Sequence, residues 1–540
     1  MTRCRSLALG LTLAFAAWGQ GGRNAGRGAP AAQPGTQQQP APGAASGRGG
    51  RGETGVPAAG TVDFYNFDPS APAGEPAPDS RPAESHQKIT LNGQTMAYTA
   101  RAGFLPLHNA TTGQSEAHLF YTYYAKDGDA PGRPLVFFFG GTPGVAAAWQ
   151  EFGGLGPRRF WSAAPGWADN PHTLLGQADL VFVNPVGTGF SRPDRPDRGP
   201  AFWNTAADIA SLGEFVRSFL IRYDRTAAPL FLAGEDRGTG RVAGLAGYLH
   251  DHDVPVRGVV LFSMAMTPDA TAGDTQYLTL LPSLTMAAWY HKKLAPEMNA
   301  MSSEQIAGQA RQFASREYLH ALYKGDRMTA DERAKAIADL SRFTGLPKQF
   351  LINNDLRVTL DRFNAELMRE QHRGLSPSDA RVTGFVPNPA AGGRGGGGFG
   401  FGPPPPPIDF NITALSAGFL SAYDSYLRHE LTYAGNQNAI FYLNSGGVGT
   451  FTAANNDAGL AAAFARNPNL RLFVTINYFD LNAPFYAIEY TLAHLNVAPE
   501  VRTKNITITH LEAGGMPYLD GRALGKLAGD LAGFVNGGTK

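Results

Sequence analysis

Short, almost wholly apolar runs recur along the chain and alternate with amphipathic segments. The runs have the length of strands and are Leu135–Phe139, Leu180–Asn184, Leu230–Leu232, Val256–Phe262, Ala439–Leu443, Leu470–Ile476 and Ile506–His510. Continuous hydrophobicity over so few residues is typical of strands buried on both faces of a mostly parallel sheet. The segments between them follow a helical period, as in Trp203–Tyr223, Gly240–His250 and Pro484–Leu495. The alternation predicts an α/β fold, with a mostly parallel sheet flanked by helices.

The alternation breaks between residues 269 and 414. Apolar positions there recur mainly at helical spacing, in Tyr277–Lys293, Ser303–Tyr323, Ala330–Phe343 and Leu356–Glu370. We therefore expect a helical cap inserted between two parts of one core, residues 83–268 and 415–540. The cap contains a Gly/Pro-rich stretch at residues 390–407, which predicts a surface loop.

The first 82 residues lie outside the expected core. Residues 1–19 combine Arg3 and Arg5 with the apolar run Leu7–Trp18 and small residues around Ala17 and Gly19. This order predicts a signal peptide, and the run is too short to span a bilayer comfortably. A short N-terminal anchor is the alternative. Residues 20–82 hold few large apolar side chains, which predicts a disordered linker.

Composition and charge narrow the choice of partners. The chain has 540 residues, of which 43% are hydrophobic, so a wholly disordered protein is excluded. Lys and Arg number 46 and Asp and Glu 45, giving a net charge of +1, so we expect no nucleic-acid partner. The single cysteine, Cys4, excludes an internal disulfide framework and a cysteine zinc site. We expect no metal or cofactor, an exported location that is periplasmic or extracellular, and no membrane span once the signal is removed; the oligomeric state stays open.

One strand-to-helix turn has a distinctive glycine pattern. Gly234-Glu235-Asp236-Arg237-Gly238 follows an apolar strand and precedes a helix. A sharp turn with glycines at both ends is the context of a nucleophile elbow, whose middle residue is usually Ser. Here the middle residue is Asp236. Taken alone, the pattern fits an ordinary strand-to-helix turn equally well.

Further segments resemble the serine carboxypeptidase family, peptidase S10, especially its exported bacterial branch. They are Pro134–Gly144 with Gly153–Arg158, Asp179–Ser191, the elbow, Asn477–Pro484 and Glu512–Met516. They are similar to the family's Asn-Gly-Gly-Pro-Gly, Pro-Val-Gly-x-Gly-Phe/Tyr-Ser, Gly-Glu-Ser-Tyr-Gly, catalytic-Asp loop and Glu-Ala-Gly-His-Met, in family order. The resemblance covers about residues 130–520 and implies an α/β-hydrolase fold and a hydrolase that removes C-terminal residues from peptides.

The catalytic positions implied by this resemblance are changed. Asp236 stands at the nucleophile position, Asp480 is the retained triad acid, and Gly515 stands at the His position. The family mechanism needs a Ser nucleophile, a His base and an Asp that orients the base. Glycine has no side chain and cannot act as a base. The resemblance therefore implies an impaired or inactive member of the family.

The substrate-binding positions are changed as well. The resemblance places the oxyanion hole at the backbone N–H groups of Thr142 and Arg237, and substrate binding at Gly140, Gly141 and Glu235. Gly140 replaces the Asn that would grip the substrate's terminal carboxylate together with Glu235. The hole survives only if Thr142 adopts the required backbone conformation.

Three functions stay open at this point. The chain is a pseudoenzyme that binds a peptide or small acyl ligand, a repurposed hydrolase that uses Asp236, or a structural or interaction protein. Asp236 and Asp480 would face one gap, so they would share a proton, pair with Arg237 or take a cation. His510 is the nearest histidine in sequence to Gly515, and we expect it to have a structural role at its strand end.

Overall fold

The computed structural model describes residues 81–128, 132–141, 144–161, 166–386, 409–434, 441, 443 and 456–537. The predicted signal peptide, nearly all of the linker, the Gly/Pro-rich loop, Thr142 and most of the run at Ala439–Leu443 lie outside these residues. Within them, no helix is both long and apolar enough to cross a membrane.

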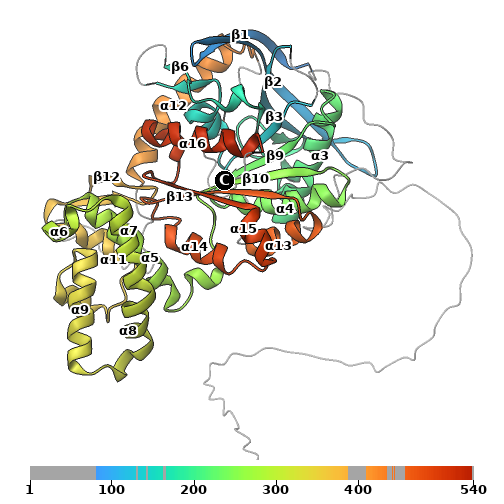
Figure 1. Cartoon of the computed structure of the whole chain (residues 1–540). Coiled ribbons are helices and arrows are strands. Elements are labelled where there is room, and N and C mark those ends of the chain that lie inside the picture. The colour runs from blue at the N-terminus through green and yellow to red at the C-terminus, as the bar shows by residue number, and fades with distance from the viewer. Residues whose placement is uncertain are drawn as a thin grey trace, which may run out of the picture. The chain divides into compact units, whose positions relative to one another are not determined.

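One large sheet forms the centre of the described chain (Figure 1). In spatial order its strands are β1 (Ala83–Leu91), β2 (Gln94–His108), β3 (Ser115–Lys126), β7 (Asp179–Val183), β4 (Leu135–Phe139), β9 (Leu230–Glu235), β10 (Val256–Phe262), β13 (Arg471–Asn477) and β14 (Ile506–Leu511). The short strand β8 (Arg192–Pro193) pairs with β3. The pairs from β1 through β7 are antiparallel, and those from β7 through β14 are parallel. Across the sheet from β2 onward, β7 lies before β4, although β7 follows β4 in the chain. All other strands on this path keep their chain order, which is the arrangement expected of an α/β-hydrolase fold.

Adjacent residues of a strand point to opposite sides of the sheet, so the apolar strands have apolar side chains on both faces. Helices cover both faces and bury these side chains. On one face Phe137 and Leu232 pack in a core shared with α2 (Gly199–Phe202), α3 (Thr205–Arg222), α4 (Gly238–Asp251), α13 (Asn456–Arg466) and α14 (Phe485–Ala493). On the other face Phe138 and Ala233 pack with α1 (Ala148–Gln150), α12 (Phe410–His429) and α16 (Gly521–Val535). The remaining core elements are β5 (Arg158–Phe160), β6 (Trp167–Asp169) and α15 (Pro499–Lys504).

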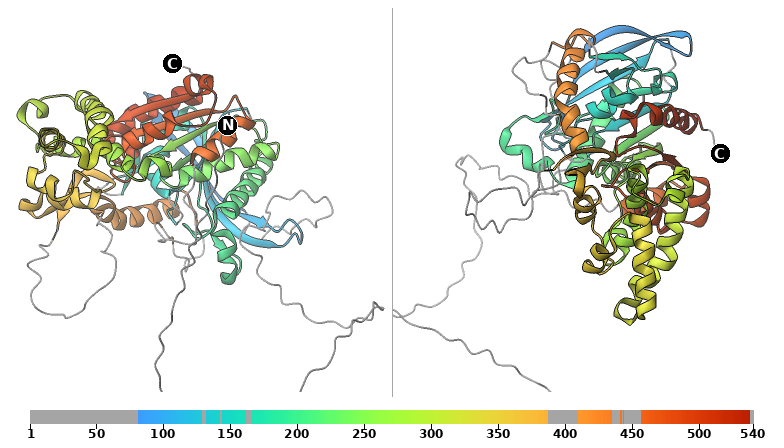
Figure 2. Two further views of the ribbon diagram at one scale, coloured as in Figure 1. Left: turned by 90° about the horizontal axis from the view of Figure 1, so that it is seen from below. Right: turned by 90° about the vertical axis from the view of Figure 1, so that its left-hand side faces the viewer.

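The segment between β10 and α12 is mainly helical and is called the cap below (Figures 1 and 2). Its helices are α5 (Thr275–Tyr290), α6 (Pro296–Asn299), α7 (Ser303–Phe313), α8 (Leu319–Lys324), α9 (Ala330–Thr344), α10 (Lys348–Asn353) and α11 (Leu360–Leu367). It also contains a hairpin of β11 (Arg373–Ser376) and β12 (Asp379–Phe385), which the sequence analysis missed. Backbone bonds tie this hairpin to the core, since the N–H of Ala380 donates to the carbonyl of Phe479 and the N–H of Gly515 to that of Ser378.

Candidate active site

The turn between β9 and α4 has the geometry of a nucleophile elbow. Asp236 has a φ of 49°, in the left-handed region that Asp tolerates better than most residues. Its N–H donates to the carbonyl of Phe262 at the end of the neighbouring strand. A Cβ at Gly234 would lie 2.6 Å from the carbonyl oxygen of Gly238, and one at Gly238 would lie 2.6 Å from that of Gly140. Both glycines are therefore required by close backbone contact.

Asp480 and Gly515 come together beyond the carboxyl ends of β13 and β14. Asp480 is buried, and its Oδ1 accepts hydrogen bonds from the N–H groups of Asn482 (2.9 Å) and Ala483 (3.1 Å). A Cβ placed on Gly515 would lie 3.1 Å from Oδ2 of Asp480. A side chain at position 515 would therefore lie directly against the carboxylate of Asp480.

Ser263, which the sequence analysis missed, lies between these two residues. It follows β10, and its φ of 46° is a left-handed value that is unusual for serine. Its hydroxyl donates to the carbonyl of Gly515 (2.7 Å) and accepts from the amide of Asn477 (2.8 Å). It also interacts with the carboxyl of Asp480. Parallel strands that lie side by side present their carboxyl ends to one crevice, and that rule could have identified Ser263.

Two buried carboxyl groups of the site hold protons near neutral pH. Burial, helped by the charges of Asp236 and Asp480 and opposed by a hydrogen bond from Tyr518, raises the pKa of Glu235 to about 8. Burial likewise raises the pKa of Asp480 to about 7, with hydrogen bonds from Ala483 and Ser263 opposing the rise. Like charges close together disfavour joint ionisation, and the three outcomes predicted for Asp236 and Asp480 stay predictions.

Tyr518 is the second residue that the sequence analysis missed. It lies three residues after Gly515, and its hydroxyl donates to Oε2 of Glu235 at 2.7 Å. Oε1 of Glu235 is buried and has no hydrogen-bond partner among the residues that the structure describes. The loop that follows β14 therefore contains both Gly515, which has no side chain, and Tyr518, which donates a hydrogen bond to Glu235.

The backbone that follows β4 accepts hydrogen bonds from a buried arginine. Nη1 of Arg241, on α4, donates to the carbonyl oxygens of Gly140 (2.9 Å) and Gly141 (3.3 Å), and its Nε pairs with Asp208. A Cβ at Gly140 would lie 2.0 Å from the carbonyl of Val145, so this backbone has no room for the family's Asn. Arg237 is exposed at the start of α4. Because Thr142 is not among the described residues, the oxyanion hole stays a prediction, as does an Asp236–Arg237 pair.

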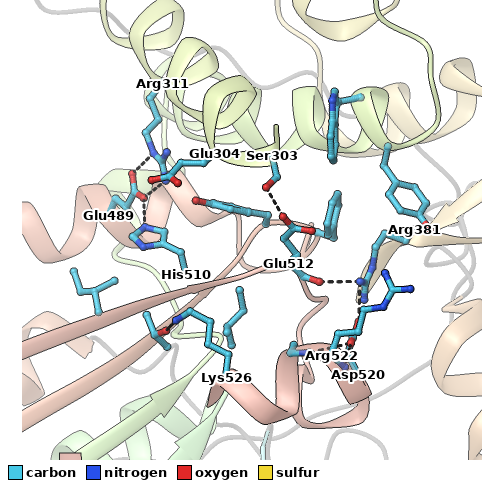
Figure 3. Close-up of a pocket in the computed structure, with 18 residues that line it drawn as sticks. Ser303, Glu304, Arg311, Arg381, Glu489, His510, Glu512, Asp520, Arg522 and Lys526 are labelled. Atoms are coloured by element: carbon cyan, nitrogen blue, oxygen red, sulfur yellow. Dashed lines mark hydrogen bonds and ion pairs between the residues drawn. The ribbon is translucent and has the colours of Figure 1, made fainter. Parts of the chain in front are cut away.

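His510 is hydrogen-bonded to a glutamate of α14. Its Nε2 lies 3.1 Å from Oε1 of Glu489 on α14, as Figure 3 shows. The hydrogen bonds described for Asp480 come from Asn482, Ala483 and Ser263, and none comes from a histidine in the described part of the chain. Within the same residues, no group of three His, Cys, Asp or Glu side chains could hold a metal ion.

A family model and individual relatives match this chain to the same protein family. Residues 91–364 match the family described as serine carboxypeptidase, peptidase S10. The chain is 29% identical over 150 residues to serine carboxypeptidase-like 36 of Arabidopsis thaliana, covering 26% of this chain and 31% of that protein. It is 26% identical over 177 residues to serine carboxypeptidase S10 family member 1 of Dictyostelium discoideum, covering 32% and 41%. The matches thus span about a third to two fifths of the length of these relatives.

Solved structures are similar at lower identity. Kex1(Δ)p, a prohormone-processing carboxypeptidase from Saccharomyces cerevisiae, has a TM-score of 0.49 and 14% identity, covering 82% of this chain and 91% of that chain. A soluble variant of monoglyceride lipase from the same yeast has a TM-score of 0.33 and 11% identity, covering 87% and 100%.

Proposed function

Because this chain belongs to the serine carboxypeptidase family, peptidase S10, we propose that it is an exported member that has lost efficient hydrolysis and binds a peptide or small acyl ligand in the family's cleft. The observation that carries this proposal is the position of Gly515. A Cβ there would lie 3.1 Å from Oδ2 of Asp480, so the acid and the base position still meet, but the base is missing.

The size of the expected loss in kcat follows from the mechanism of a Ser-His-Asp triad. Removing members of a Ser-His-Asp triad lowers kcat by up to about a million-fold, and about 10³–10⁴-fold over water remains from the oxyanion hole and binding. Here two of the three members are replaced, by Asp236 and Gly515. Binding does not depend on the triad in the same way, because binding contributions remain when triad members are removed.

A repurposed hydrolase is the second candidate, and one observation favours it. Glu235 and Asp480 have pKa values of about 8 and 7, which are suitable for a general acid at neutral pH. Asp236 at the elbow would then act as nucleophile or base. This activity would be slow and would disappear in Asp236→Ala.

The test is steady-state release of C-terminal residues from a panel of blocked dipeptides by the purified protein. We compare the parent, Asp236→Ala and the double variant Asp236→Ser/Gly515→His. We expect no turnover by the first two, binding of panel members measured by thermal shift, and gain of turnover in the double variant. Turnover by the parent that Asp236→Ala abolishes would overturn the proposal in favour of the repurposed hydrolase. Absence of turnover and of binding throughout would overturn both candidates.

A further inference from the structure

A cavity with a volume of about 880 Å³ lies between the cap and the edge of the sheet. Neither Asp236, Asp480 nor Gly515 lines it. Its volume is within the range of about 300–1,000 Å³ that is usual for ligand sites. Figure 3 shows α7 residues on one side, α16 residues on the opposite side, and His510 and Glu512 between them.

The floor of this cavity is an open strand edge. Five consecutive residues line it, from Ile508 to Leu511 at the end of β14 and Glu512 directly after the strand. β14 is the last strand of the sheet and pairs only with β13 among the described residues. The N–H of Leu472 donates to the carbonyl of Asn505, and the N–H of Tyr478 donates to that of Leu511.

This register determines which backbone groups are unpaired. In a parallel pair, alternate residues of a strand bond to the same neighbour, so the odd-numbered residues from Asn505 to Leu511 face β13. The N–H and C=O groups of Ile508 and His510 therefore point away from the sheet. No strand lies on that side within the described part of the chain. Such an edge is a template for another extended segment.

The walls provide both apolar and charged surfaces. Trp289 and Tyr290 of α5 and Phe479 of the β13 loop give aromatic surface, and Tyr290 is 44% exposed. Several of the charges are already paired, with Arg311 to Glu489 and Arg381 to Asp520. Because these charges neutralise each other in pairs, the distribution of charge that a ligand would meet in the cavity depends on other residues.

Two exposed charges lie at opposite sides of the cavity, and a third, Glu512, lies between them and accepts a hydrogen bond from Ser303. Glu304 is in the first turn of α7, and Arg522 is in the first turn of α16. Neither has an ion-pair partner among the described residues. A peptide with a basic group toward Glu304 and an acidic group toward Arg522 would complement both.

From these observations we propose that the edge of β14 is a binding site for an extended peptide of about four to six residues, which adds as a strand and carries a basic and an acidic group. The main-chain bonds to Ile508 and His510 supply affinity, and the aromatic wall and the two charges supply selectivity. The site is separate from the family's cleft and does not depend on the function proposed for that cleft.

The test uses a fluorescent pool of hexapeptides with alternating random positions, and the full chain. After selection of the tightest member, the same peptide is made with N-methyl groups at alternate residues in both registers. We expect one N-methylated register to bind at least about tenfold more weakly, because it lacks the N–H groups that meet the strand edge. No binding by any pool member, or equal binding by both N-methylated forms, would overturn the proposal.

The charge arrangement is tested separately with Arg522→Glu, which changes an exposed side chain. We expect binding of the selected peptide to fall by about threefold to tenfold at low salt and less at high salt. Arg316→Glu is the matched control, since Arg316 is exposed on the cap and does not line the cavity. An equal effect of both variants would contradict the assigned polarity. A dimer that forms through β14 and excludes the peptide in sedimentation experiments would also overturn the proposal.

Discussion

Replacing Glu235 with Gln should change how stability depends on pH. Burial raises the pKa of Glu235 from an ordinary 4.5 to about 8. Below pH 4.5 this group is neutral in the folded and the unfolded chain and does not affect stability. Between pH 4.5 and 8 the unfolded chain releases the proton while the folded chain keeps it. Since stability falls with pH wherever the folded state binds more protons, the free energy of unfolding decreases across this window.

The magnitude follows from the same values. The pKa rises by about 3.5, and at 1.36 kcal/mol for each pKa unit the full penalty above pH 8 is about 5 kcal/mol. Relaxation around a buried charge reduces this figure, so we expect about 2–5 kcal/mol. Glutamine has no charge and still offers an oxygen to the Tyr518 hydroxyl. Asp480, with a pKa of about 7, keeps part of the slope in the variant.

The assay is urea unfolding of parent and Glu235→Gln at pH 4.5, 6.5 and 8.5, followed by tryptophan fluorescence. The free energy of unfolding of the variant, relative to the parent, should rise by about 2–5 kcal/mol from pH 4.5 to 8.5. Glu489→Gln is a control of opposite sign. Burial would raise the pKa of Glu489, but hydrogen bonds from His510 and Arg311 hold it below the ordinary value, so this carboxylate stabilises the fold above pH 4.5 and the control should lose stability there. Parallel pH profiles for parent and Glu235→Gln would refute the reasoning.

Three further substitutions give separate checks by the same unfolding assay. Asp236→Gly should stabilise the protein by about 1 kcal/mol, because φ of 49° favours glycine and one of three close carboxylates is removed; a loss of stability would contradict this. Ser263→Ala should cost about 1–3 kcal/mol, since the carbonyl of Gly515 loses its buried donor; no change would show that this bond adds nothing. Asp208→Ala should cost about 3–5 kcal/mol by leaving Arg241 buried without its carboxylate, and Asp208→Ala with Arg241→Met should recover part of the loss.

Much of the parallel half of the sheet could be predicted from the sequence because its strands are apolar on both faces. Leu135–Phe139 and Val256–Phe262 are strands with the predicted bounds. β2 and β3 were missed because they are long and carry polar residues such as Arg101 and His118 among the apolar ones. The hairpin at β11 and β12 was missed because it is short and has an Arg at the start of one strand and an Asp at the start of the other.

The candidate site likewise has one part that a local sequence pattern indicates and another part that it does not. The sequence indicated an elbow as one of two readings because Gly234 and Gly238 mark the turn, and the structure gives Asp236 a positive φ there. The roles of Ser263 and Tyr518 depend on contacts between segments about 250 and 280 residues apart, with Gly515 and Glu235. Such contacts leave no local pattern, so only the convergence of strand ends could have indicated them.

The insertion of the cap between β10 and β13 has a consequence for biosynthesis. These strands pair side by side, with Gly258 opposite Arg471, yet about 210 residues separate the end of β10 from the start of β13. At a translation rate of about 5–20 residues per second, the ribosome needs about 10–40 s to supply the missing neighbour. During that time the edge of β10 is an unsatisfied template for other chains. We expect nascent chains that stop before residue 471 to aggregate unless a chaperone covers this edge.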